Sequence, residues 1–96
     1  MSKKLILKSK YNFDIEYSKQ AEKFLETHQS LKSRINKAIL NLPQSAKVEP
    51  LSGFDNRYRA RVGDYRIIFD LYEDIFLIDI RCIDSRGQVY KHSRKD

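Results

Sequence analysis

Residues 51–72 read LSGFDNRYRARVGDYRIIFDLY, two alternating runs of apolar side chains separated by Gly63-Asp64. A Gly-Asp pair between two such runs predicts a β-hairpin with a two-residue turn of the primed type, because that turn matches the twist of the strands. If the residues that flank the turn pair with each other, Arg61 lies directly opposite Arg66.

The hairpin sorts its side chains onto two faces, because successive residues of a strand point to opposite sides. The apolar face carries Tyr58, Ala60, Val62, Tyr65, Ile67, Phe69 and Leu71. The other face carries Arg59, Arg61, Arg66 and Ile68. Like charges opposite each other destabilise a sheet, and guanidinium groups hold phosphate through paired hydrogen bonds. We therefore expect an anion between Arg61 and Arg66, with no protein carboxylate balancing them.

The composition limits the class of protein. A chain of 96 residues predicts one domain, 1–96. Its net charge of +6 favours a polyanionic partner such as nucleic acid. The single cysteine, Cys82, lies in an apolar run and is expected in the core, and its lack of a partner favours the reducing cytoplasm. No metal-ligand spacing and no long apolar run occur, so we expect no metal, no cofactor and no membrane segment.

The N-terminal half predicts one strand and two helices. Residues 11–17 alternate with period two, which indicates a half-buried strand. Ser18 is the expected N-cap of a helix that ends near Thr27, and Ser30 begins a second helix that Pro43 ends. The apolar positions of the two helices are Ala21, Phe24, Leu25, His28, Leu31, Ile35, Ala38, Ile39 and Leu42. Residues 1–10 read as either a lead-in or an edge strand, and residues 44–50 as a loop.

Residues 75–83 are almost continuously apolar, which predicts a third and central strand. A tight Glu73-Asp74 turn would pair Tyr72 with Ile75. The core face then gains Phe76, Ile78, Ile80 and Cys82, and the arginine face gains Leu77, Asp79 and Arg81.

This register places Arg81 opposite Arg66, so that Arg61, Arg66 and Arg81 form one row across three strands, with Asp79 near enough to orient one guanidinium. A longer turn would break the row. The expected fold is α+β: a small antiparallel β-sheet with two N-terminal α-helices packed on one face and the arginines on the other.

The order of these elements, with YRARVGDYRIIF at residues 58–69 and RGQVYK at residues 86–91, resembles the RelE/ParE superfamily of type II toxin–antitoxin toxins. The resemblance covers residues 11–92. It implies one of two activities: RelE-like members are ribonucleases that cut mRNA on the ribosome, and ParE-like members poison DNA gyrase. In both branches a cognate antitoxin protein holds the toxin inactive.

The resemblance also implies site residues. The basic residues of the RelE pattern fall on Arg59 and Arg61, the arginine after the turn on Arg66, and the late tyrosine on Tyr90. A further family arginine aligns with Asp84, where either Arg86 or Arg81 could substitute. The expected catalytic set is Arg59, Arg61, Arg66, Arg86 and Tyr90, and the expected RNA-binding residues are Arg81, Lys91 and His92.

Metal-free RNA cleavage needs a base for the 2′-hydroxyl, positive charge at the phosphorane and an acid for the leaving oxygen. Arginines suit the second task, but they stay protonated and are poor bases. The candidates for the base are Tyr90, His92 and Lys91. Tyr90 could instead stack on an RNA base.

Three functions remain open on the sequence. The favoured one is an mRNA-cleaving endoribonuclease toxin. The second is a gyrase-poisoning toxin, which needs a protein-binding surface in place of a catalytic set. The third is a non-catalytic RNA-binding relative, which Asp84 favours because it replaces the family arginine.

Overall fold

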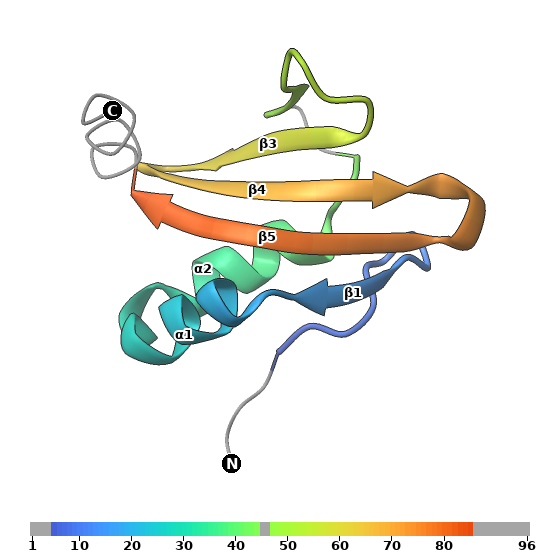
Figure 1. Ribbon diagram of the computed structural model, residues 1–96. Helices are drawn as coiled ribbons and strands as arrows, with labels where there is room; N and C mark the ends of the chain where they lie inside the picture. Colours follow the sequence, from blue (N-terminus) through green and yellow to red (C-terminus); the bar gives the residue numbers. More distant parts are fainter. Residues whose placement is uncertain (1–4, 45–46, 86–96) are drawn as a thin grey trace.

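The structure, a computed structural model, describes residues 5–44 and 47–85. In chain order its elements are β1 (Asp14–Tyr17), α1 (Lys19–Thr27), α2 (Gln29–Leu40), β2 (Val48–Pro50), β3 (Arg57–Val62), β4 (Tyr65–Tyr72), the 3-10 turn η1 (Glu73–Ile75) and β5 (Leu77–Ser85). The strands form one sheet in the order β1-β5-β4-β3-β2, and both helices lie on one side of it (Figure 1). The expected α+β fold is confirmed.

The β3–β4 hairpin has the predicted register. Arg61 pairs with Arg66, and the pairing runs without a shift over the whole of β3, from Val62 with Tyr65 to Arg57 with Asp70. Gly63 has a φ of 60°, a backbone conformation that glycine adopts without steric cost and that primed turns require.

The β4–β5 connection is longer than predicted. Its chain passes through η1 and a left-handed Phe76 with φ 51° and ψ 52°, so that Tyr72 pairs with Leu77 and not with Ile75. The side chain of Phe76 is 53% exposed, so its predicted place in the core is wrong.

A β-bulge in β5 changes which residues face the core. The register shifts between Ile68, which pairs with Cys82, and Phe69, which pairs with Ile80, so Arg81 has no partner on β4. After an extra residue the alternation reverses its phase. Ile83 is therefore fully buried, whereas Cys82 is only half-buried and lies opposite Ile68. The prediction of Cys82 as a core residue is wrong.

The N-terminal strand differs from the expected antiparallel sheet. β1 pairs with β5 in parallel, from Asp14 with Leu77 to Tyr17 with Ile80, so the sheet is mixed. The strand begins at Asp14, because the backbone turns at Asn12, which has a φ of 67°. A crossover through both helices and the hairpin separates the two paired strands, and period two alone does not show the direction of pairing.

The helices agree closely with the sequence. The hydroxyl oxygen of Ser18 accepts a hydrogen bond from the amide of Ala21 at 3.1 Å, which is the predicted N-cap of α1. α2 begins at Gln29, one residue before the expected Ser30. Residues 5–8 contribute an isolated bridge between Lys8 and Asp14 and no strand.

The predicted loop at residues 44–50 contains β2, which pairs antiparallel with β3 at the edge of the sheet. Three residues are too few to show a period, and Pro50 is a residue that sheets confine to their edges. β2 brings Glu49 opposite Arg59, and this pairing governs the arginine face.

The core lies between the helices and the inner face of the sheet. Its buried side chains are Phe13, Ile15, Ala21, Phe24, Leu25, Ile35, Ile39, Leu42, Ala60, Val62, Ile67, Phe69, Ile78, Ile80 and Ile83. Burial of a large apolar side chain stabilises a fold by roughly 1.5–3 kcal/mol, so this cluster determines which face of the sheet the helices cover. Arg59, Arg61 and Arg66 remain on the face that they do not cover.

Candidate nucleic-acid interface

Two neighbouring strands hold Arg59, Arg61 and Arg66 on the open face. Arg61 and Arg66 are direct cross-strand partners, and Arg59 lies two residues from Arg61 on the same side of β3. Arg61 is 46% exposed at its side chain and Arg59 is 22% exposed. The sequence prediction that these arginines share a face is therefore confirmed.

Glu49 pairs with two of these arginines. Arg59 Nη2 donates to Glu49 Oε2 at 2.7 Å, and Arg61 Nη2 donates to the same oxygen at 3.3 Å. The hydrogen bond from Arg59 holds the pKa of Glu49 below its ordinary value, with smaller contributions from the charges of both arginines. The expectation of arginines without a balancing carboxylate is therefore wrong.

Sequence reasoning missed Glu49 because its strand is too short to show a period. One signal was available: a Glu-Pro pair before the hairpin places a carboxylate at a sheet edge next to an arginine-rich strand. The Nε of Arg59 is buried and has no hydrogen-bond partner among the described residues.

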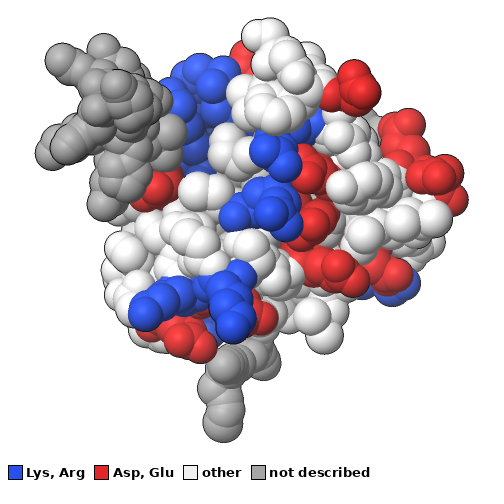
Figure 2. Space-filling model, in the orientation of Figure 1, with Lys and Arg blue, Asp and Glu red and all other residues white. Residues whose placement is uncertain are grey.

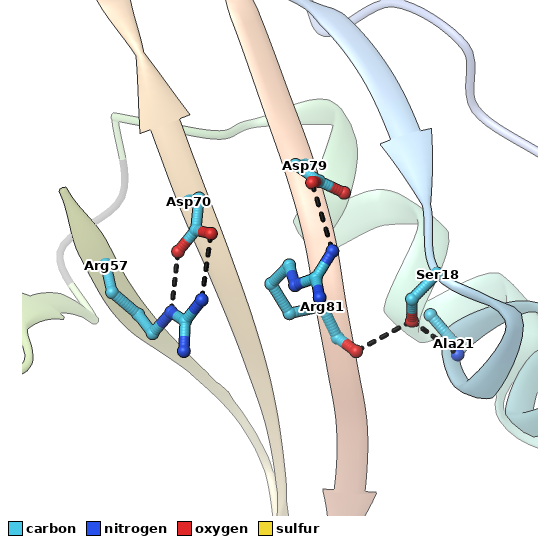
Figure 3. A network of polar contacts seen from close by, with 6 residues as sticks. All are labelled: Ser18, Ala21, Arg57, Asp70, Asp79 and Arg81. Carbon is cyan, nitrogen blue, oxygen red and sulfur yellow. Dashed lines mark hydrogen bonds and ion pairs between the residues drawn. The ribbon is translucent and has the colours of Figure 1, made fainter.

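Arg57, a fourth arginine of the hairpin stretch, is committed to a structural pair. Its Nε and Nη2 donate to the two carboxylate oxygens of Asp70 at 2.6 and 3.0 Å (Figure 3), and this bidentate bond raises the pKa of Arg57. Asp70 is only 6% exposed. The guanidinium also lies 4.7 Å from the centroid of the Phe54 ring, so it ties the loop at residues 51–56 to the sheet.

Arg81 does not extend the arginine row. Its Nη1 donates to Asp79 Oδ2 at 3.2 Å (Figure 3), which confirms that Asp79 orients a guanidinium. The bulge removes Arg81 from its predicted place opposite Arg66, and Asp84 is the residue that pairs with Arg66 instead. The predicted row of three arginines is wrong, because the longer turn and the bulge shift β5 by three positions at this end.

Charge is unevenly distributed over the described surface. Lys and Arg side chains lie on the left and in the centre of the view in Figure 2, and Asp and Glu side chains dominate its right side, where Figure 1 shows the β4–β5 turn. Glu73 and Asp74 of that turn are both exposed. The arginines that pair across β3 and β4 lie at the opposite end, next to the Gly63 turn.

Four predicted site residues, Arg86, Tyr90, Lys91 and His92, lie outside the described residues. The structure brings together Arg59, Arg61 and Arg66 and places Arg81 elsewhere. In the described part of the chain, no helix has the length and apolar composition that crossing a membrane requires.

The protein is an α+β domain in which two helices cover one face of the sheet and arginines lie on the other face. Comparison with known proteins identifies its family. The family model described as "ParE toxin of type II toxin-antitoxin system, parDE" matches residues 15–90. The chain belongs to this family, so it is a toxin of the RelE/ParE superfamily of type II toxin–antitoxin systems.

Solved structures agree with this assignment. The chain is 27% identical to a chain of the archaeal RelE-RelB complex from Pyrococcus horikoshii OT3, with 78% of this chain and 96% of that chain covered and a TM-score of 0.62. It is 26% identical to YafQ from E. coli strain BL21(DE3), with coverage of 82% and 99% and a TM-score of 0.57.

A third structure, from the RelB-RelE antitoxin-toxin complex of Methanococcus jannaschii, is 26% identical, with coverage of 80% and 96% and a TM-score of 0.56. A search of curated proteins found no match. The resemblance read from the sequence is therefore confirmed at the level of the superfamily.

Proposed function

We propose that this toxin is an endoribonuclease that cleaves mRNA without a metal ion, by attack of the RNA 2′-hydroxyl on the adjacent phosphodiester. The observation that carries the proposal is the direct opposition of Arg61 and Arg66 on the open face, with Arg59 beside them. A pair of like charges is costly in a sheet. Glu49 bonds to Arg61 and Asp84 lies opposite Arg66, and an RNA phosphate placed between the two guanidinium groups would balance their charge further.

The arginines bind the phosphate and stabilise its transition state. Their backbones belong to two hydrogen-bonded strands, so the positions from which the guanidinium groups reach the phosphate are fixed before negative charge builds on the phosphorane. Arg presents a planar fork of donors that matches two phosphate oxygens. The unused Nε donor of Arg59 is one more group that a phosphate could satisfy.

Proton transfer requires other residues. Tyr90 is the first candidate for the base that takes the 2′-hydroxyl proton, and His92 and Lys91 are alternatives. Glu49 is a fourth candidate, because its carboxylate lies beside Arg59 and Arg61, but its lowered pKa makes it a weaker base. It must first release Arg59 and Arg61, so an incoming phosphate and the Glu49 carboxylate compete for the same guanidinium groups.

The proposal includes partners and a location. A cognate antitoxin would cover the arginine face and supply acidic side chains, mRNA on the ribosome would be the substrate, and the toxin would act in the cytoplasm. Two similar structures described above are complexes of RelE with RelB, which supports an antitoxin as a partner.

The test is induced expression of the wild type beside Arg66→Ala and Tyr90→Phe, followed by mapping of mRNA 5′ ends. Arg81→Ala is the matched control, because it removes an arginine from the same sheet outside the Arg61–Arg66 pair. Defined cleavage by the wild type and by Arg81→Ala, with loss in the other two, supports the proposal. Growth arrest without new 5′ ends would overturn it.

Gyrase poisoning is the second candidate, because the matching family model describes a ParE toxin. Under this hypothesis the toxin binds a protein and needs no phosphate between Arg61 and Arg66. Purified toxin, gyrase and supercoiled plasmid distinguish the two functions: gyrase-dependent DNA breaks favour poisoning, and their absence together with cleavage of mRNA on ribosomes favours the nuclease.

A further inference from the structure

A groove lies between α1 and the C-terminal half of β5. Its volume is about 510 Å³, within the roughly 300–1,000 Å³ typical of small-molecule sites. The lining side chains are Gln20, Lys23, Phe24, Thr27, His28, Cys82 and Asp84.

The walls of the groove are held rigidly. β1 covers the edge of β5 as far as Ile80, and beyond that point side chains at the start of α1 bind the edge. Gln20 Nε2 donates to the carbonyl of Ile83 at 2.9 Å, and the amide of Ile83 donates to Gln20 Oε1 at 3.0 Å. The Ser18 hydroxyl donates to the carbonyl of Arg81 at 2.7 Å (Figure 3). The groove is therefore formed before any ligand arrives.

The helix wall of the groove contains a flat aromatic surface. The His28 ring stacks on the Phe24 ring, with centroids 3.9 Å apart and planes inclined by 9°. His28 Nδ1 lies 2.9 Å from the Phe24 carbonyl oxygen, and because a carbonyl only accepts, Nδ1 carries the proton of that bond. This bond and the stacking fix the orientation of the ring. Stacking on such a surface is how proteins commonly hold unpaired bases.

The strand wall of the groove contributes a hydrogen-bond acceptor. The side chain of Asp84 is a carboxylate, whose two oxygens accept hydrogen bonds. Beside it, Cys82 stays a neutral thiol, because burial and the charge of Asp84 raise its pKa. The groove thus offers an aromatic surface, a carboxylate and the ammonium group of Lys23.

The groove continues the arginine row. Arg61 on β3 pairs with Arg66 on β4, which pairs with Asp84 on β5, and Asp84 lines the groove. Paired residues point to the same side of a sheet, and neighbouring strands are about 4.8 Å apart. A nucleotide whose phosphate lies between the two arginines can therefore reach Asp84 with its base.

We propose that this groove binds the nucleobase next to the phosphate held by Arg61 and Arg66, and that Asp84 selects guanine. Guanine is the RNA base with two adjacent N–H donors on its Watson–Crick edge, which match the two oxygens of a carboxylate. The inference rests on the proposed function, because it takes the position of the phosphate from the arginines. The replacement of a family arginine by Asp84 thus becomes a determinant of sequence preference.

The test uses 2′-deoxy dinucleotides of each base, which lack the attacking hydroxyl and cannot be cleaved by this chemistry. Each is titrated into the full-length toxin while NMR follows the amides of Lys23, Cys82 and Asp84 at the groove and those of Arg61 and Arg66 at the arginine pair. Asp84→Asn is the informative variant, because it keeps the Oδ1 acceptor that the Ser85 amide uses at 3.1 Å and changes the other oxygen to a donor. Asp74→Asn, an exposed carboxylate at the far turn, is the control.

We expect the guanine dinucleotide to bind about tenfold more tightly than the others, the discrimination of one bidentate base contact. Asp84→Asn should abolish this preference and Asp74→Asn should keep it. Equal shifts for all bases, or shifts confined to Arg61 and Arg66, would overturn the inference even if mRNA is cleaved. Guanine-selective binding by a toxin that cleaves no mRNA would instead support the groove and overturn the proposed function.

Discussion

The two ends of the open sheet face use arginine differently. At the end near the β4–β5 turn, Arg57 makes two hydrogen bonds to an Asp70 carboxylate that is 6% exposed. At the Gly63 end, Arg59 and Arg61 share a single oxygen of Glu49, whose side chain is 45% exposed. The buried Asp70 carboxylate binds Arg57 through both oxygens, so this pair stabilises the fold. The exposed Glu49 makes one hydrogen bond to each of Arg59 and Arg61, so both arginines keep further N–H donors for a ligand.

We expect the largest effect of a substitution at the Gly63 end, on the rate of mRNA cleavage. Removing one preorganised donor from a developing charge typically costs about 10²–10³ in rate. Arg66→Ala should therefore slow single-turnover cleavage of ribosome-bound mRNA by about that factor, without lowering the midpoint of urea unfolding. Arg81→Ala should change the rate little, and an equal loss in both variants would show that only net positive charge matters.

The Asp70 end should control stability instead. Asp70→Ala leaves the Arg57 guanidinium without its partner, and we expect a loss of roughly 2–3 kcal/mol in the free energy of unfolding, below the full cost of breaking a buried ion pair because Arg57 retains some contact with water. Urea unfolding measures the loss. A cycle with Arg57→Ala should show strong coupling between the two side chains, and independent effects would contradict a structural pair.

Glu49→Gln tests whether the arginines of the Gly63 end are available to a ligand. It removes the negative charge that competes with phosphate but retains a hydrogen-bond acceptor. We expect binding of a 2′-deoxy oligonucleotide to tighten by about two- to fivefold, the range of an exposed ion pair, with little change in the unfolding midpoint. The same variant tests the base candidates, since cleavage slows if Glu49 takes the proton. Weaker binding would show that Glu49 positions the arginines and does not compete.

We expect the smallest effect from the titration of Glu49, which makes the stability of its ion pairs depend on pH. The pKa of Glu49 lies below its ordinary value of 4.5 because Arg59 donates to it. The ion pairs therefore contribute stability above the unfolded-state pKa and lose it as the pH falls through the folded-state value. A ¹³C NMR titration should find a Glu49 midpoint below 4.5. Arg59→Ala should raise that midpoint more than Arg61→Ala, whose hydrogen bond is longer, and the reverse order would contradict the assigned cause.

Features of the site that depend on residues close together in the sequence could be predicted, and features that depend on distant residues could not. The opposition of Arg61 and Arg66 depends on a two-residue turn, and it could be predicted from the sequence between them. The position of Glu49 depends on a pairing between β2 and β3 across a loop, and short edge strands carry no periodic signal. Arg86, Tyr90, Lys91 and His92 remain predictions from the sequence, because they lie outside the described residues.

The sequence by itself determined the two helices and the β3–β4 register, because alternation, an N-cap and a Gly-Asp turn act within a few residues, and its resemblance to known toxins indicated the superfamily. Only the tertiary structure decided what lies beside Arg66. Ile78, Ile80 and Ile83 are all fully buried, and strict alternation cannot turn all three of them inward. The bulge in β5 resolves this conflict. Together with the longer β4–β5 turn, it places Asp84 opposite Arg66, where a tight turn and strict alternation predicted Arg81.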